Sequence, residues 1–190
     1  MAKQSDIVDK SREYVKLRFE KELPEICTYH NFTHTQNVVN AVQSLADKAN
    51  VTDEEKEVLI IAAYFHDIGF IINAEDHEAH GIKISSNFLK SEGYPDILIQ
   101  EVIKCINATR IEWNGTARLC KLMKDADLSG LSNKNFTIIT EGLRLELSAR
   151  NKKNIDKEIW RGQNITFLEN HSYLSDEGKK IFRKGKKRNL

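Results

Sequence analysis

Hydrophobic positions along the chain recur with the 3.6-residue period of an α-helix, and no segment keeps the strict alternation of a strand. The clearest amphipathic segment runs from about residue 33 to residue 49, where valines, a leucine and alanines fall at i, i+3, i+4 and i+7. Residues 7–19, 82–89 and 97–106 follow the same rule. The pattern predicts an all-α protein.

The most apolar segment, V-L-I-I-A-A-Y-F, covers residues 58–65. Thr52 and the three acids after it are typical of an N-cap and a first helical turn. The helix that begins there is apolar nearly all round, which predicts a buried central helix running towards Asp67 and ending at Gly69.

The second half of the chain predicts helices over 116–128, 136–150, 154–171 and 175–184, with a loop at 129–135. No internal repeat and no linker divides the sequence. At 190 residues, the length fits one domain. We therefore expect a single irregular helical bundle over residues 1–190.

Composition and charge narrow the class of protein further. The three cysteines, Cys27, Cys105 and Cys120, form no C-x-x-C pair, so we expect buried thiols in a reducing compartment. The first twenty residues are charged throughout and carry no apolar signal-peptide core. The longest apolar run has eight residues, whereas a membrane span needs about 20. These features predict a cytoplasmic protein with no membrane partner.

The formal net charge is +1, but acidic and basic residues are unevenly distributed along the chain. The last twelve residues carry seven Lys or Arg and no acid, which leaves 22 basic and 28 acidic residues in the rest. We interpret the basic tail, 179–190, as a solvated end. A mildly acidic body lacks the broad basic surface of a nucleic-acid-binding protein.

Histidines beside acids are the candidates for chemistry. His30 and His34 lie one helical turn apart in Y-H-N-F-T-H-T and could share a face; two surface imidazoles would give the same pattern. His66-Asp67 ends the apolar helix, where a buried charge needs a partner or a metal. An ordinary salt bridge of Asp67 is the alternative there.

Two further groups of histidine and acidic residues are less specific indicators of a functional site. H-E-A-H, residues 77–80, is one residue shorter than the zinc-protease motif H-E-x-x-H, which excludes that reading and leaves His80 as a candidate ligand. Asp125 and Asp127 point to different sides of a helix, so at most one of them enters a shared site easily. We expect His171 to be structural or exposed.

Two histidines and two aspartates from three separate segments could converge inside the bundle. Imidazole and carboxylate ligands suit Mn²⁺, Fe²⁺, Zn²⁺ or Mg²⁺. Because no thiolate joins them, such a site is not a closed structural zinc site. It keeps an open position of the kind that metal-assisted hydrolysis requires.

The ordered set His34, His66-Asp67 and Asp127 resembles that of the HD-domain metal-dependent phosphohydrolases. Y-H-N-F-T-H-T is similar to the Y-H-N-x-x-H segment of cyclic-nucleotide phosphodiesterases and of small bacterial HD proteins. A-A-Y-F-H-D-I-G and K-D-A-D-L-S-G-L resemble the segments that carry the His-Asp pair and the last Asp. The resemblance covers residues 29–131 and extends more loosely over 136–184.

The resemblance implies an all-α, phosphodiesterase-like HD fold and a ligand set. The implied metal ligands are His34, His66, Asp67 and Asp127. Asp127 is preferred over Asp125 because the family's ligand follows an alanine. His80 matches a position that binds a second metal in some members. K-C-I-N-A-T, residues 104–109, lacks the later histidine of the usual dinuclear site, so a second ion stays open.

The implied activity is hydrolysis of a phosphoester or phosphodiester, by the resemblance one of a nucleotide, with hydroxide on the metal as nucleophile. His30 would protonate the leaving oxygen while nearby carboxylates keep it charged. Asp67 would be catalytic through the metal, and Lys124 would offset phosphoryl charge. His30, His80 and Lys124 would contact the substrate. The cofactor would be one divalent ion per chain, Mn, Mg, Fe, Zn or Co.

Three other functions stay open. A catalytically weak HD domain could sense a nucleotide or bind a partner. A mixed-valent di-iron oxygenase needs more histidine ligands than the motifs supply. A (p)ppGpp hydrolase of this superfamily would carry a Glu-Asp pair after the His-Asp, which this chain lacks. The sequence also leaves a homodimer open.

Overall fold

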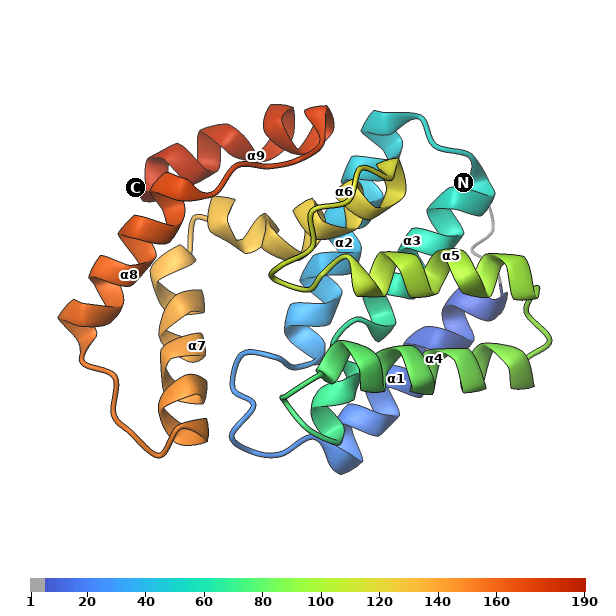
Figure 1. The fold of residues 1–190 in the computed structure, drawn as a ribbon, viewed down its shortest axis with the longest axis horizontal. Helices are drawn as coiled ribbons and strands as arrows, with labels where there is room; N and C mark the ends of the chain where they lie inside the picture. Colours follow the sequence, from blue (N-terminus) through green and yellow to red (C-terminus); the bar gives the residue numbers. More distant parts are fainter. Residues whose placement is uncertain (1–5) are drawn as a thin grey trace.

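A computed structural model describes residues 6–190, so the first residues of the charged N-terminal segment lie outside the described part. Over that range the chain is all-helical, with nine α-helices, two short 3₁₀ helices and no strand (Figure 1). The α-helices are α1 (Asp6–Glu22), α2 (Phe32–Ala49), α3 (Asp53–Phe65), α4 (His77–Ser91), α5 (Asp96–Asn107), α6 (Arg118–Asp127), α7 (Phe136–Arg150), α8 (Lys157–Asn170) and α9 (Asp176–Asn189). The 3₁₀ helices are η1 (Ile68–Ile71) and η2 (Leu128–Ser132).

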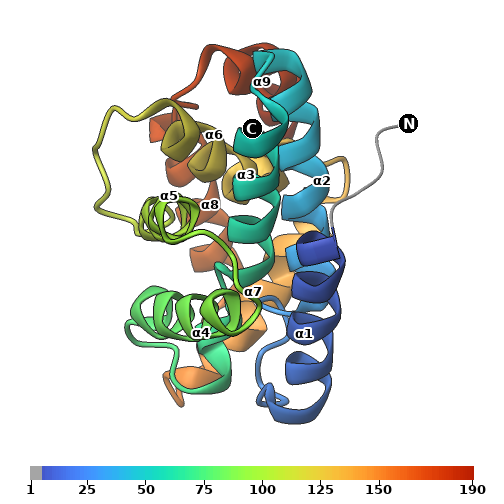
Figure 2. The same ribbon diagram turned by 90° about the vertical axis from the view of Figure 1, so that its right-hand side faces the viewer.

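The central helix of the fold is α3, as the apolar pattern predicts. Every residue from Val58 to Phe65 is buried. The helix begins at a capping box, in which the Thr52 hydroxyl accepts from the Glu55 amide and the Glu55 carboxylate accepts from the Thr52 amide. Helices α2 and α5 pack on it, and α2 and α3 run side by side through the middle of the molecule (Figures 1 and 2). The core therefore surrounds the helix that ends at His66.

The end of α3 is shaped by a close approach of the backbone. The chain turns at Asp67 into η1, and η1 packs tightly on the start of α4. A Cβ on Gly69 would overlap the carbonyl oxygen of His77, so only glycine fits there. This packing brings the first turn of α4 beside the His66-Asp67 pair.

Helices α7 and α8 stand apart from the main core, on the left in Figure 1. A small separate cluster of Leu131, Phe136 and Leu168 joins them to η2. Several of their large apolar side chains are exposed, including Ile138 and Ile159. The expectation of a loop at 129–135 is wrong in part, because residues 128–132 form η2.

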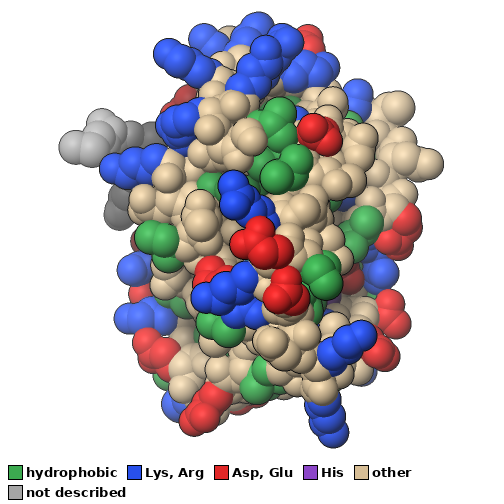
Figure 3. All heavy atoms as spheres, turned by 90° about the vertical axis from the view of Figure 1, so that its left-hand side faces the viewer, with side chains coloured by type: hydrophobic (Ala, Val, Ile, Leu, Met, Phe, Trp, Pro, Cys, Tyr) green, Lys and Arg blue, Asp and Glu red, His purple; other side chains and the backbone are tan. Residues whose placement is uncertain are grey.

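The basic tail is helical and extends α9 five residues beyond the predicted end at 184. Figure 3 shows Lys and Arg side chains gathered at the top of the face that looks out from α7 and α8. Lys186 and Arg188 nevertheless donate to backbone carbonyls of other segments, including that of Ser132. The tail is thus a docked helix, and most of its basic side chains are exposed to solvent as predicted.

The burial of the three cysteines agrees with the prediction from the sequence. Cys27, Cys105 and Cys120 are buried free thiols. None of the helices within residues 6–190 is long and apolar enough to cross a bilayer.

His171, after α8, makes stability depend on pH. Burial, followed by the charges of Lys186 and Lys124, lowers its pKa to about 4, and its Nδ1 is buried without a hydrogen-bond partner. Between pH 6.5 and 4 the unfolded chain therefore binds more protons at this position, so stability falls as the pH falls. We expect the wild type to lose about 1 kcal/mol more stability than His171→Phe between pH 7.5 and 5, after allowance for solvent screening. Urea unfolding of both proteins in EDTA measures this, and equal losses would contradict it.

Candidate metal centre

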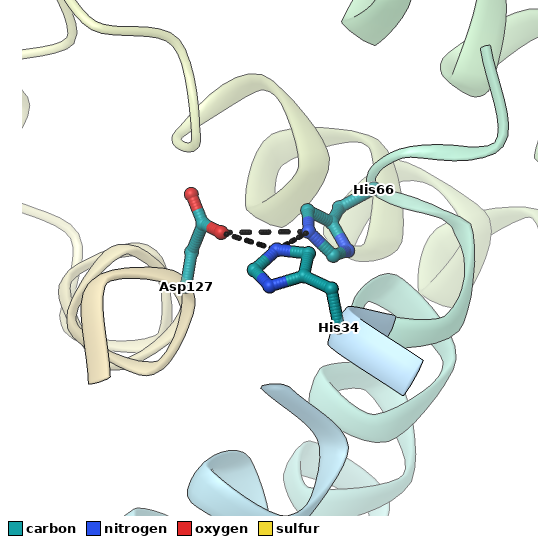
Figure 4. A group of neighbouring side chains, drawn as sticks. All are labelled: His34, His66 and Asp127. Atoms are coloured by element: carbon teal, nitrogen blue, oxygen red, sulfur yellow. Dashed lines mark hydrogen bonds and ion pairs between the residues drawn. The ribbon is translucent and has the colours of Figure 1, made fainter. Parts of the chain in front are cut away.

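Three possible ligand atoms converge from three helices. His34 lies in the first turn of α2, His66 follows the last turn of α3, and Asp127 ends α6. Asp127 Oδ1 is 3.3 Å from His34 Nε2 and 3.5 Å from His66 Nε2, and the two nitrogens are 3.4 Å apart (Figure 4). These three residues form a group that could hold a metal ion.

Local sequence features place each of these side chains. Asn31 caps α2 by accepting from the amides of Thr33 and His34, so the first turn carrying His34 is fixed. His66 Nδ1 donates to the carbonyl oxygen of Ala63 at 2.8 Å. That bond selects the tautomer whose Nε2 is free to ligate, which is the usual arrangement of a metal-binding histidine.

Asp67 completes the cluster on the buried side. Its Oδ2 lies 3.1 Å from His66 Nε2 and 3.4 Å from His34 Nε2. This oxygen is buried and has no hydrogen-bond partner. A buried carboxylate oxygen without a donor is costly unless a cation binds it.

The distances between these atoms can be compared with those between ligands of a single metal ion. Ligand atoms about 2.1 Å from one ion are separated from each other by roughly 3.0–3.4 Å. The separations of the two imidazole nitrogens from each other and from the carboxylate oxygens run from 3.1 to 3.5 Å, which is close to that range. Two imidazoles and two carboxylates suit a first-row divalent ion or Mg²⁺.

The electrostatics of the cluster favour charged carboxylates. Burial by itself would raise the pKa of Asp127, but hydrogen bonds from His34 and His66 outweigh it and hold that pKa well below its usual range. Burial raises the pKa of Asp67 as well, but nearby histidines, first the charge of His66, lower it overall. Burial also lowers the pKa of His66, yet Asp67 and Asp127 raise it overall to well above 6.5. The cluster therefore holds positive charge, either protons or a metal.

His30 is anchored by an acid that sequence reasoning missed. Glu146 of α7 is fully buried, and its Oε1 lies 2.5 Å from His30 Nδ1. Its Oε2 accepts from the backbone amides of Tyr29 and His30. Burial raises the pKa of Glu146, but its bonds to His30 lower it overall. The carboxylate holds Nδ1 and leaves Nε2 as the free nitrogen of His30.

Phe70 links His30 to a second unexpected residue, His77. The Phe70 ring stacks on His30 with centroids 4.2 Å apart and packs at the same distance against His77. His77 Nδ1 lies 3.0 Å from the Ala74 carbonyl oxygen, while its Nε2 lies 3.6 Å from Asp67 Oδ1. The imidazole beside the outer oxygen of Asp67 is therefore that of His77.

None of the described hydrogen bonds or ion pairs joins the side chain of His80 or Lys124 to this cluster. His80 lies one turn later on α4, and none of the described hydrogen bonds or ion pairs involves its side chain. Lys124 Nζ donates to the carbonyl oxygen of Arg110. Burial lowers the pKa of Lys124, and Asp127, Glu112 and Glu78 partly oppose that effect. Its charge thus lies near Asp127 while its nitrogen is held by the backbone.

Asp125 faces away from the ligands, as the i, i+2 argument requires. Its carboxylate accepts from the amides of Leu174 and Ser175, at 2.7 and 2.8 Å, and from the Ser175 hydroxyl at 2.6 Å. A Cβ on Gly178 would collide with it. Asp125 therefore fixes the start of α9 to α6.

We expect Asp125→Ala to destabilise the protein by about 3 kcal/mol, because it leaves buried donors without an acceptor. The variant should still bind metal when folded, since Asp127 and both histidines remain. Urea denaturation and metal analysis of the folded fraction test the two statements. A folded variant that has lost its metal would show that Asp125 supports the ligands more directly.

Of three comparisons with known proteins, one gave a match. Neither the curated proteins nor the solved structures gave a match to the chain. The family model of the HD domain matches residues 31–130, a segment that contains His34, His66, Asp67 and Asp127. It covers more than half of the chain, and the helical fold agrees with it. The protein therefore belongs to the HD domain family.

Proposed function

We propose that the protein is a metal-dependent phosphohydrolase that cleaves a phosphoester or phosphodiester, with a nucleotide as the expected kind of substrate. One observation carries the proposal. The Oδ2 atom of Asp67 is buried, faces two imidazole nitrogens and has no hydrogen-bond partner. A divalent ion held by His34, His66, Asp67 and Asp127 would supply Lewis-acid chemistry: activation of water and charge compensation at phosphorus.

The residues around the cluster would supply the rest of the chemistry. Glu146 fixes the ring of His30 through Nδ1, so Nε2 would donate a proton to the leaving oxygen. Phe70 packs against one face of that ring and restricts its rotation. Lys124 lies close enough to Asp127 to add positive charge at the edge of the site, where phosphoryl oxygens would lie.

We propose one ion as the minimum. A second ion would use Asp67 Oδ1 together with His77, because His77 and not His80 lies beside that oxygen. We further propose that residues 6–190 act as one domain, since Glu146 of α7 bonds directly to the segment that carries His30.

Metal analysis combined with an activity screen tests the function. The purified protein is analysed for bound elements and then assayed with p-nitrophenyl phosphate and bis-p-nitrophenyl phosphate in Mn²⁺, Mg²⁺, Co²⁺ and Zn²⁺. We expect at least one metal per chain and turnover that Asp67→Ala abolishes. Asp9→Ala, which changes an exposed acid in the first turn of α1, is the control and should keep both. Full turnover by metal-free Asp67→Ala would refute the proposal, and nucleotide binding without turnover in any ion would favour a sensing role.

A further inference from the structure

A cavity of about 310 Å³ opens beside the metal centre. Tyr29 and Asp127 line it together with residues of η2, α7 and α8, and the α7 and α8 residues lie beyond the segment that the HD model matches. Asp127 therefore belongs to the ligand cluster and to the cavity wall at once. A molecule with its phosphoryl group at the cluster can extend directly into this space.

The lining of the cavity is mainly apolar and aromatic. Its apolar side chains are Leu128, Leu131, Phe136, Ile139, Leu143, Trp160 and Phe167. The volume is at the lower end of the range for small-molecule pockets. Flat aromatic walls favour stacked or edge-to-face contact with another ring.

Most polar groups of the lining already have partners. The Trp160 indole N–H donates to the Thr140 carbonyl oxygen at 3.0 Å, and the Thr140 hydroxyl donates to Thr137 at 3.3 Å. The Asn164 amide donates to the Trp160 carbonyl oxygen at 2.8 Å. Gln163, an exposed residue of α8, and Tyr29 line the cavity with an amide and a hydroxyl that none of the described hydrogen bonds uses. A strongly hydrated group would find few replacements here for its lost water.

A second cavity near the metal centre has a more polar lining than the first. It measures about 200 Å³, also touches Asp127, and is lined partly by polar side chains such as Asn37, Ser129 and Asn133. Hydroxyl and amide groups there suit the hydrated part of a substrate. The two cavities share Tyr29, Asp127, Gly130 and Ile139 and offer different chemistry beside the metal centre.

We infer that the cavity between η2, α7 and α8 binds a flat aromatic group of the substrate, so that the enzyme acts on phosphoesters that carry an aromatic ring rather than on simple sugar phosphates or inorganic polyphosphates. The inference rests on the proposed function for the position of the phosphoryl group. An aryl ring and a nucleobase share the required chemistry. A nucleobase would in addition use the Gln163 amide at one edge.

Non-hydrolysable probes test the inference without turnover. The binding of 1-naphthylphosphonate and of methylphosphonate is measured by calorimetry in Mn²⁺. We expect the naphthyl compound to bind at least roughly tenfold more tightly, the selectivity that a small apolar group gives in a hydrophobic pocket. Competition by adenosine 5′-phosphate and by ribose 5-phosphate then shows whether the preferred ring is a nucleobase or a simple aryl group.

Two tryptophan substitutions on the same helix form a matched pair. Leu143 lines this cavity, so Leu143→Trp should remove most of the naphthyl preference. Leu145, which is 47% exposed, contributes to no described cavity, so Leu145→Trp should keep the preference. Equal binding of both phosphonates to the wild type, or the same loss in both variants, would overturn the inference.

The outcomes separate this inference from the proposed function. A protein that prefers the naphthyl compound but hydrolyses no phosphoester in any metal would contradict the function and leave the aromatic site standing. A protein that hydrolyses small phosphoesters without any preference for aromatic ones would contradict the aromatic site alone.

Discussion

Asp127→Ala is expected to abolish metal binding and hydrolysis while leaving the protein folded. Asp127 contributes an oxygen 3.3 and 3.5 Å from the two imidazole nitrogens, and these two histidines are the only partners described for its side chain. Loss of a direct ligand should exceed the 10–100-fold loss of affinity or activity that follows removal of an outer-shell partner. Calorimetric titration with Mn²⁺ and initial rates on bis-p-nitrophenyl phosphate measure both effects.

Asp125→Ala is the natural comparison, since it removes an identical side chain two residues away. The two substitutions should have opposite effects when stability is compared in EDTA: Asp127→Ala loses metal binding and keeps most of the stability of the metal-free protein, whereas Asp125→Ala loses stability and keeps metal binding. If Asp127→Ala bound Mn²⁺ with the affinity of the wild type, the assignment of the centre would be wrong.

The second large effect concerns His30. We expect His30→Ala to slow hydrolysis of an alkyl or phenyl ester by roughly 10²-fold or more, the usual contribution of a general acid. Hydrolysis of a p-nitrophenyl ester should change far less, because its leaving group needs no proton. The ratio of the two rates is the measurement, and it is independent of how much active protein each preparation contains.

Two further variants sharpen this test. Glu146→Gln keeps the shape of the side chain that holds His30 but removes its charge, and it should reproduce the leaving-group dependence in weaker form. His171→Phe, which alters a histidine after α8, should leave the rate ratio unchanged. Equal slowing of both esters by His30→Ala would show that His30 positions or binds substrate rather than donating a proton.

Local pattern was enough to predict most of the helices. The capping box at Thr52 and the uniformly apolar run behind it define the start of α3 and its buried course. Its end was predicted at Gly69, whereas the helix stops at Phe65 because the chain turns at Asp67 into η1. The predicted loop at 129–135 was wrong in part. Gly130 and the serines favour a turn, but the short 3₁₀ helix η2 forms where Leu131 joins the small cluster with Phe136 and Leu168. Whether such a short segment forms a loop or a 3₁₀ helix depends on its tertiary packing and not on the local sequence.

The site was predictable only where residue order carries information. His34, His66-Asp67 and Asp127 follow a recognisable order along the chain. Glu146 does not, since it lies 116 residues after His30 on a helix whose pattern is ordinary. An acid amid apolar positions of α7 is its only signal in the sequence. The sequence shows His77 only as part of a shortened zinc-protease-like motif. The tight packing at Gly69, which places His77 beside Asp67, cannot be inferred from residue spacing.

The origin of the ligands in three separate helices has a thermodynamic consequence. The unfolded chain cannot bring these side chains together, so an ion that binds them stabilises the folded state by mass action. At a free concentration 100 times its Kd, that gain is about 2.7 kcal/mol, a large share of the stability of an ordinary domain. The resistance of this protein to unfolding would then follow the divalent-ion concentration of its surroundings, and chelators would act on it as denaturants.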